Sequence, residues 1–525
     1  MATTDEIQQA VESFFLLFNG VIVFLMSCGY TLIESGGVRS QNAGHSLFKT
    51  LLIFITSALA YWVTGYAFAF GGTPNVILGT RFWVSEKFGS RVDNQAGYPG
   101  VENFTNSNNV YNLNNQDPYI HFFYHYMLTF LVTNIAASAF AERCQVIVYV
   151  LFSILMSGFI YPFLAHWMWG SNGWLGDVVG ARDYGGSAII YLTAGVAALI
   201  GTIFLGPRFG RFEPRALPLF GHSIPITSVG AILVAFGFFV LNSGADHRIT
   251  GVAYGDRVGH GLINTVLSGA ASGATYYILQ RLIESVKQPA RHLKRRVFLS
   301  TVNSIIAGMV AVAGGAVAYN PWSAIVIGFI AALSFLLWSK LLLKFHVDDP
   351  VETAAVHIGG GLWGIFAVPI FRRTIGAGVN GGYEENALSI IYRITMGESW
   401  RGLLNSLCTA AVVMAWTAIF ITILFLVLKL VRLLKVSRDE ELRGIDLFQH
   451  GEPAYALRIY CAACGEQLQG KTIEHETIGA RPNFPAIVTD AEGAIVPIEY
   501  FSDRNGSSGN INGTKIKSMN EENRV

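Results

Sequence analysis

The sequence predicts an all-α polytopic membrane protein with eleven transmembrane helices, ten of which form a five-plus-five inverted repeat. Three observations lead to this prediction: the composition, the number of long apolar stretches and a polar pattern that occurs twice. Of the 525 residues, 52% are hydrophobic and 14% are charged, whereas soluble domains carry roughly 25% charged residues. A helix that spans a bilayer needs about 20 largely apolar residues, and the chain offers such stretches throughout its first four-fifths.

The apolar stretches define the predicted spans, and their small residues indicate how they pack. Glycine, alanine, serine and threonine recur in them, as in SGAASGATYY and AGMVAVAGGAVAY. Small side chains allow helices to approach closely, so we expect most of these helices to be buried against one another. We place the spans at 12–35, 47–71, 119–140, 145–167, 185–206, 222–243, 261–283, 298–319, 321–343, 350–371 and 403–434.

The distribution of basic residues predicts the orientation. The short segments after spans 1, 5 and 7 contain Arg39 and Lys49, then three arginines between 208 and 215, then the run KQPARHLKRR. Basic loops lie in the cytoplasm, so we expect an N-terminus outside the cell and a cytoplasmic C-terminus in a multi-pass protein of the plasma membrane. Asn103 begins a glycosylation sequon in the first outer loop, which agrees with this orientation.

After the last span the chain becomes polar. We expect a membrane domain over 1–434, a cytoplasmic regulatory segment over 435–470, and a tail over 471–525 that is disordered toward its end. Cys461 and Cys464 form a CxxC pair, which is half of a zinc site, so we interpret them as reduced cytoplasmic thiols and expect no metal. A net charge of +1 argues against a nucleic-acid partner.

A nine-residue pattern opens two of the apolar spans. Asp183 to Tyr191 reads DYGGSAIIY at the start of span 5, and Asp349 to His357 reads DPVETAAVH at the start of span 10. Because the copies are five spans apart, the second crosses the membrane in the opposite direction. Inverted repeats of this kind place their substrate site near the middle of the membrane, between the two halves.

Each aspartate is placed to cap the helix that follows it. Asp349 precedes Pro350 and Glu352, a pattern that fits a capping box with proline in the first helical turn. Eight residues of helix extend about 12 Å, so we expect Tyr191 and His357 to approach a shared axis from opposite faces. An ionisable side chain inside a membrane costs several kcal/mol and is rarely kept without a use, which favours a functional role for His357.

Several segments resemble the ammonium transporter (Amt/Mep/Rh) family, specifically a eukaryotic member of the Amt type. They are spread over residues 12–460 and include GYTLIESGGVRSQNAGH, AERCQ, YPFLAHWMWGSNGWL, GHSIPITSVGAIL, DDPVETAAVHIGGGLWGIF and GIDLFQHGEPAY. The resemblance implies three identical subunits, each with a narrow pore, so we expect a homotrimer embedded in membrane lipid. It also implies that the motif at 444–455 belongs to a regulatory tail.

By this resemblance, a cation is bound at an outer site. Trp169 and Asp183 match the family's Trp and Asp; a Trp face attracts a small cation, and a carboxylate raises the local cation concentration. Phe238 stands where the family has a second Trp, and Ala245 stands where it has a Ser that hydrogen-bonds the ion. We therefore expect a substrate site of Trp169, Asp183 and Phe238 that lacks one ligand.

The resemblance also assigns the pore. The family's two stacked Phe rings correspond to Leu128, with Tyr124 one turn above it, and to Leu241, which predicts an aliphatic barrier. The family's pair of histidines corresponds to Tyr191 and His357. A tyrosine hydroxyl can hydrogen-bond to imidazole, but it does not titrate near neutral pH, so Tyr191 is expected to be the poorer proton relay.

The function predicted from these residues is transmembrane transport of ammonium. The cation would be recruited and dehydrated at the outer site, ammonia would cross the apolar pore, and Asp349 would support the inner mouth. An ammonium-binding sensor with little or no conduction is the alternative, favoured by Tyr191, Ala245 and the leucine barrier. An enzyme is not expected, and neither is a cofactor, because the sequence contains no metal set, nucleophile elbow or cofactor loop.

Overall fold

The computed structural model describes residues 3–71, 77–79, 83–85, 118–170, 172–213, 219–251, 254–287, 297–372, 398–455, 487–489 and 495–497. The chain divides into two compact units, Met1–Glu452 and Pro453–Val525. In the second unit, strands β1 (Ile487–Thr489) and β2 (Ile495–Pro497) pair antiparallel, with Val488 opposite Val496. Asn103, Cys461 and Cys464 lie outside the described residues.

The first unit is helical, and several of its rods combine α-helix with short π-helical or 3₁₀ segments (η). The helical elements are α1 Thr4–Gly37, η1 Ser40–Asn42, α2 Ala43–Ala60, η2 Tyr61–Gly65, α3 Tyr66–Phe70, η3 Trp83–Ser85, α4 Pro118–Ser138, α5 Val146–Leu155, η5 Met156–Ile160, α6 Tyr161–Trp169, η6 Trp174–Val178, η7 Ser187–Leu192, α7 Thr193–Leu205, α8 Ile224–Ser243, α9 Tyr254–Lys287, α10 Val297–Ala313, η8 Ala316–Ala318, α11 Pro321–Lys344, α12 Thr353–Phe371, α14 Glu398–Leu430, α15 Arg438–Arg443 and η9 Asp446–His450.

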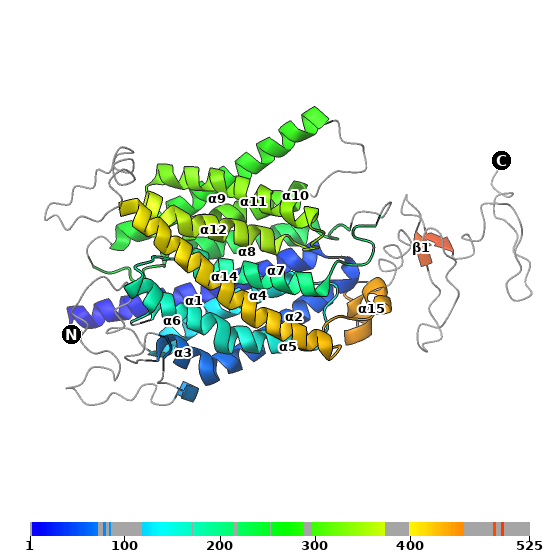
Figure 1. The fold of residues 1–525 in the computed structure, drawn as a ribbon, viewed down its shortest axis with the longest axis horizontal. Coiled ribbons are helices and arrows are strands. Elements are labelled where there is room, and N and C mark those ends of the chain that lie inside the picture. Colours follow the sequence, from blue (N-terminus) through cyan, green and yellow to red (C-terminus); the bar gives the residue numbers. More distant parts are fainter. Residues whose placement is uncertain are drawn as a thin grey trace, which may run out of the picture. The chain divides into compact units, whose positions relative to one another are not determined.

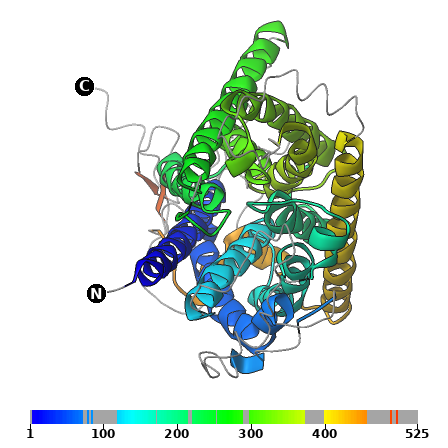
Figure 2. The same ribbon diagram turned by 90° about the vertical axis from the view of Figure 1, so that its left-hand side faces the viewer.

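These elements confirm the predicted helical membrane fold. Each of the eleven predicted spans coincides with one rod, if α2–η2–α3, α5–η5–α6 and η7–α7 are each counted as one (Figure 1). Within the described residues, eight helical segments are long and apolar enough to cross a membrane, and α10 is a shorter apolar helix. The rods lie side by side, and α14 packs along both α7 and α12 (Figures 1 and 2).

Small residues set the closest helix contacts, as their frequency in the spans predicts. A Cβ atom on Gly29 of α1 would lie 2.8 Å from the Gly230 carbonyl of α8, and one on Gly230 would lie 2.6 Å from the Gly29 carbonyl. Helices α9, α10 and α11 meet in the same way, since a Cβ on Gly308 or Gly328 would lie within 2.5 Å of the Ser268 carbonyl. Backbones at this distance gain van der Waals contact that lipid tails do not replace.

Glycines also join the two helices that begin with the repeated pattern. A Cβ on Gly195, four residues after Tyr191, would lie 2.7 Å from the nitrogen of Ile358. A Cβ on Gly361, four residues after His357, would lie 2.9 Å from the nitrogen of Leu192. In each copy of the pattern, therefore, a glycine follows the ring by one helical turn. Because this glycine has no side chain, the helical turn that carries the ring of the other copy can pack directly against it.

Both aspartates cap their helices, but the second helix begins later than the sequence indicates. Asp183 Oδ2 accepts hydrogen bonds from the Ala188 and Ile189 amides, and Asp349 Oδ2 accepts one from Ala354. The predicted capping box is wrong, because α12 begins at Thr353 and Glu352 precedes it in a left-handed conformation (φ 60°). The Glu352 carboxylate instead accepts hydrogen bonds from side chains on α10 and α11, namely Ser300, Asn303 and Ser339.

Lys49 does not lie in a loop, so it should not count among the basic loop residues from which the membrane orientation is predicted. It lies within α2, is fully buried, and pairs with Glu34 of α1, with 2.6 Å between Nζ and the carboxylate. Arg39 and Arg208, by contrast, lie in the segments that follow α1 and α7, where the sequence places them.

Candidate functional site

Four aromatic rings from four helices form a buried column within the helical unit. The rings of Tyr191 on η7 and His357 on α12 stack with centroids 6.0 Å apart and an interplanar angle of 23°. Phe238 of α8 stacks on Tyr191 at 5.3 Å, and Tyr30 of α1 lies 5.6 Å from His357. Tyr191 and Phe238 are completely buried, and His357 is 2% exposed.

Hydrogen bonds determine which nitrogen of His357 carries a proton. Nδ1 lies 2.8 Å from the Thr353 carbonyl oxygen, which can only accept, so Nδ1 is the protonated nitrogen of the neutral ring. Nε2 then accepts from the Tyr30 hydroxyl at 3.2 Å. The ring is therefore held in one tautomer by its own helix and by α1.

Tyr191 is not part of this hydrogen-bond arrangement. Its hydroxyl is buried and has no hydrogen-bond partner among the residues that the structure describes. Leaving a hydroxyl in this state costs about 1–3 kcal/mol. The column thus contains one polar group whose hydrogen-bonding capacity is unused by the protein.

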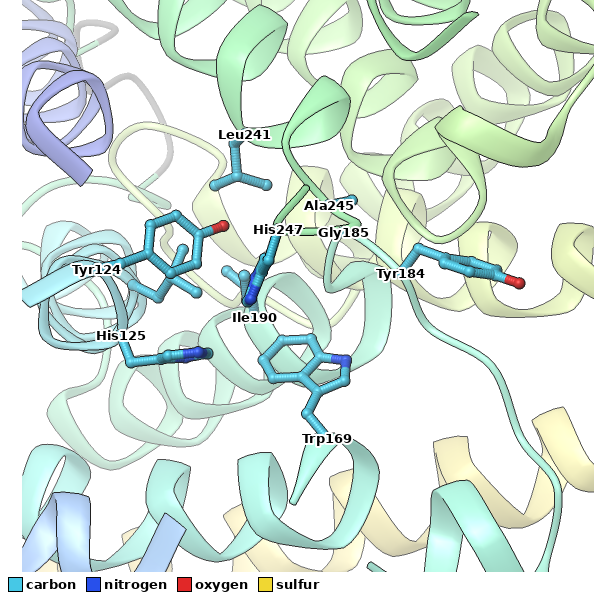
Figure 3. A pocket seen from close by; sticks show the side chains of 10 residues that line it. Tyr124, His125, Trp169, Tyr184, Gly185, Ile190, Leu241, Ala245 and His247 are labelled. Atoms are coloured by element: carbon cyan, nitrogen blue, oxygen red, sulfur yellow. The ribbon is translucent and has the colours of Figure 1, made fainter. Parts of the chain in front are cut away.

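A pocket lies next to this column, and Figure 3 shows the side chains that line it. Its lining includes Ile190, which precedes Tyr191 in sequence, and Leu241, which lies one helical turn after Phe238 on α8. The pocket therefore adjoins the stacked rings of Tyr191 and Phe238. The remaining lining residues are Tyr124, His125, Leu128, Trp169, Tyr184, Gly185, Ala245 and His247.

Trp169, which lines the pocket, is in direct contact with Asp183. The indole Nε1–H donates to the Asp183 backbone carbonyl over 2.7 Å, and this bond fixes the ring of Trp169 at the end of α6. The Asp183 carboxylate is 3% exposed and uses one oxygen to cap η7, while Oδ1 has no partner among the described residues. Burial raises the pKa of the Asp183 carboxyl to about 6, although hydrogen bonds from the helix amides lower it, so the group is mostly ionised at neutral pH.

The structure separates the residues assigned from the sequence into two adjoining places. Tyr124, Leu128, Trp169 and Leu241 lie together in the pocket, where Ala245 also lies. Phe238 instead belongs to the column with Tyr191 and His357. Asp349 caps α12, and its Oδ1 has no partner among the described residues.

Several residues of these places were given no role from the sequence, and three of them carry polar groups of interest. Tyr30 holds Nε2 of His357, and His125 and His247 line the pocket. His125 follows His121 by one helical turn, a spacing that puts both rings on one face of α4 and could have drawn attention to them. His247, in the segment after α8, has no comparable sequence pattern.

A second polar cluster lies where α1, α4, α7 and α11 end, at the predicted cytoplasmic side. Glu142 accepts from the Arg39 backbone and guanidinium over 2.7 Å each and lies 3.2 Å from Arg208. Arg208 also pairs with Asp348 at 2.7 Å. Burial opposes ionisation of Glu142, but Arg39 and Arg208 hold its pKa at about 2. Burial also opposes ionisation of Asp348, but the neighbouring positive charges, above all that of Arg208, keep its pKa below the usual range.

The segment after α14 folds back onto this cluster. Asp446 caps α2, since its carboxylate accepts from the Gly44 amide at 3.0 Å and the His45 amide at 2.6 Å. The Ile445 amide donates to Asn42 at 2.9 Å. Glu441 is 2% exposed and accepts from the Phe209 amide at 2.6 Å. The segment from α15 to η9 is therefore tied to the helix ends by buried polar contacts.

The fold, the pocket and the ring column together define a class of protein. It comprises polytopic helical membrane proteins in which two related helices bring polar rings together in a buried column next to a pocket. Within that class, the chain belongs to the ammonium transporter family, because the model of the Ammonium Transporter Family matches residues 13–455.

Curated relatives and solved structures agree with this assignment. "Putative ammonium transporter 1" of Caenorhabditis elegans is 31% identical over 86% of this chain and 80% of that protein. "Ammonium transporter 1 member 3" of Solanum lycopersicum is 30% identical over 86% and 94%. A solved structure described as a sensor Amt protein is 25% identical, with a TM-score of 0.69 over 84% of this chain and 99% of that one. Candida albicans Mep2, 22% identical, has a TM-score of 0.68 over 89% and 94% and shows the shared fold.

Proposed function

We propose that this protein transports ammonium or ammonia across the membrane through the pocket and the ring column. The observation that carries the proposal is their adjacency: the pocket lined by Trp169 is also lined by Ile190, next to Tyr191, and by Leu241, one helical turn after Phe238 of the same ring column. Family membership supports the substrate, since curated relatives of this chain are named ammonium transporters.

Recruitment would take place at Trp169. The indole is held in place by its bond to the Asp183 carbonyl, so the ring is already fixed when a small cation approaches the indole. The Asp183 carboxylate, whose Oδ1 lacks a protein partner among the described residues, adds negative potential nearby. With Ala245 in the lining, no hydroxyl is supplied from that position.

Passage beyond the pocket requires removal of water and charge. Leu128 and Leu241 line the pocket, and an apolar constriction excludes hydrated ions by dewetting. A cation entering this low-dielectric region is destabilised relative to its neutral form, as burial destabilises a lysine ammonium. Ammonia would therefore be the species that continues past Leu128 and Leu241.

Within the column, Tyr191 and His357 would act differently on the substrate. The Tyr191 hydroxyl has no partner in the described part of the chain and can donate to, or accept from, a passing ammonia molecule. His357 Nε2 already accepts from Tyr30 and Nδ1 donates to Thr353. His357 would shape the passage. The proton that ammonium loses would return to the outer solvent, and ammonia would take another proton from water at the far side, near Asp349.

Topology and assembly complete the proposal. We infer a plasma-membrane protein with the N-terminus outside and the C-terminus in the cytoplasm, a homotrimer, and a glycan on Asn103. The membrane domain covers 1–434, the regulatory segment 435–470 and the terminal tail 471–525. The docking of Asp446 and Glu441 onto the helix ends supports a regulatory role for the first part of this tail.

The test is uptake in cells that lack their own ammonium uptake. Expression should restore growth on low ammonium and produce uptake of labelled methylammonium. Trp169→Ala should raise the half-saturating methylammonium concentration roughly tenfold, the loss of about 1–2 kcal/mol of cation–π attraction, and Trp169→Phe should restore part of it. Normal surface expression without growth or uptake would refute transport; methylammonium binding without flux would instead establish the sensor alternative, which the curated relatives do not favour.

A further inference from the structure

Three histidines from separate segments meet beside the pocket. His121 and His125 lie on α4, one turn apart, and His247 follows α8. Their ring centroids are 4.3 Å apart for His121–His125 and 5.3 Å for His125–His247. The ring nitrogens that could bind a metal lie within 4.8 Å of one another, and each residue is at most 5% exposed.

The surrounding contacts leave nitrogens available for a ligand. His121 Nδ1 lies 2.9 Å from the Tyr66 hydroxyl, which leaves Nε2 without a partner in the described part of the chain. Neither nitrogen of His125 has a hydrogen-bond partner there. An unsatisfied buried polar group costs about 1–3 kcal/mol. His121 and His125 are adjacent, and together they have three such nitrogens in the described part of the chain.

We propose that His121, His125 and His247 form a binding site for a divalent transition-metal ion, best suited to Zn²⁺. The donors are imidazole nitrogens without a carboxylate, a set that favours zinc, copper or nickel over calcium or magnesium. In a tetrahedral zinc site, nitrogens at about 2.0–2.1 Å from the metal lie about 3.4 Å apart. In the structure the nitrogens lie within 4.8 Å of one another, and small rotations of the three rings would bring them to the shorter spacing.

The environment has the features of a supported metal site. A ligating histidine usually donates its other ring N–H to an oxygen that orients it, and the Tyr66 hydroxyl is placed to receive that N–H from His121. Phe70 packs against both α4 histidines, with centroids 4.8 Å from His121 and 4.2 Å from His125. An apolar neighbour of this kind limits water access, and a pocket-facing fourth position remains for water.

Occupation would act on the substrate pathway, a consequence that rests on the proposed function. His125 and His247 line the same pocket as Trp169, and the His247 ring packs on Tyr124 with centroids 4.7 Å apart (Figure 3). A divalent ion there would repel a monovalent cation approaching Trp169. It would also tie α4 to the segment after α8, so we expect zinc to inhibit uptake.

Zinc binding is measured first, independently of transport. Tag-free full-length protein in detergent is titrated with ZnCl₂ in competition with a chromophoric chelator. We expect one ion per chain, at least tenfold weaker binding in His125→Gln and in His247→Asn, and a roughly tenfold loss in Tyr66→Phe, the usual range for an orienting group. Asn suits position 247 because its backbone is left-handed (φ 57°). His260→Gln, a half-buried histidine on α9 outside the cluster, is the matched control.

The outcomes separate the site from its consequence. Equal affinity in the wild type, His125→Gln and His247→Asn, with all three eluting alike in gel filtration, would overturn the site and leave the histidines as packing residues. CoCl₂ should give the intense visible absorption of a tetrahedral complex in the wild type but not in the variants. Zinc should then lower methylammonium uptake in the wild type, relative to its own zinc-free rate, and not in the variants; binding without inhibition would overturn the inhibitory role alone.

Discussion

The rings of Tyr191 and His357 stack 6.0 Å apart, yet their polar atoms do not pair: Nε2 of His357 faces the Tyr30 hydroxyl at 3.2 Å. The two copies of the repeated pattern therefore share a packing surface but no hydrogen bond. The polar partner of His357 comes from α1, outside the pair of related helices. This arrangement makes Tyr30 a positioning residue for the His357 tautomer and leaves the Tyr191 hydroxyl without a hydrogen-bond partner among the described residues.

Removing the Tyr30 hydroxyl should cost stability, because it leaves His357 Nε2 buried without a donor. We expect Tyr30→Phe to lower the free energy of unfolding by about 1 kcal/mol. Tyr161→Phe is the matched control, since Tyr161 is also a buried tyrosine and its hydroxyl has no partner among the described residues. Thermal unfolding in detergent measures both variants. A melting temperature that falls as much for Tyr161→Phe as for Tyr30→Phe would remove the tautomer argument.

Tyr191→His should change the charge carried with each substrate molecule. A histidine there would place a second imidazole against His357, and the ordinary pKa of imidazole lies near neutral pH, whereas tyrosine does not titrate in that range. We expect a higher ratio of current to methylammonium uptake in Tyr191→His than in the wild type, measured in the same cells. Tyr191→Phe removes the hydroxyl alone and should leave that ratio low. An unchanged ratio in all three would show that this position does not control proton movement.

The repeated pattern was predictable because its chemistry is local in sequence. An aspartate, a helix start and a ring eight residues later can be counted without a structure, and Asp183 and Asp349 do cap their helices. The capping box at Glu352 could not be judged in this way, since its carboxylate is bound by side chains of α10 and α11. The same limit applies to His247, whose meeting with His125 depends on how α4 and α8 pack.

The cluster around Glu142 should make folding sensitive to acid. The folded-state pKa of Glu142 is about 2, compared with an ordinary value of 4.5. A carboxylate with a lowered pKa contributes stability that is complete above its ordinary pKa and is lost as the pH falls through the folded value. We therefore expect the free energy of unfolding to fall between about pH 4.5 and pH 2, with Asp348, whose pKa is also lowered, adding to the loss.

Glu142→Gln should remove the Glu142 part of that acid sensitivity. At neutral pH the variant should be destabilised by about 3–5 kcal/mol, because Arg39 and Arg208 lose a buried counter-charge. Glu213→Gln, an exposed carboxylate in the segment after α7, is the control and should behave as the wild type. Melting temperatures across a pH series provide the measurement. Parallel curves for the wild type and Glu142→Gln would show that the acid transition arises elsewhere.

Asp446→Ala should release the segment from α15 to η9 from the helix ends. The substitution removes the two hydrogen bonds that cap α2 at Gly44 and His45, and loss of such a cap costs about 0.5–2 kcal/mol. Hydrogen exchange of residues 437–450 should become faster, while exchange in α4 and α12 should not change. Asp439→Ala, an exposed position of α15, is the matched control. If residues 437–450 keep their protection in Asp446→Ala, the contacts of Glu441 with Phe209 and of Ile445 with Asn42 hold the segment without the cap.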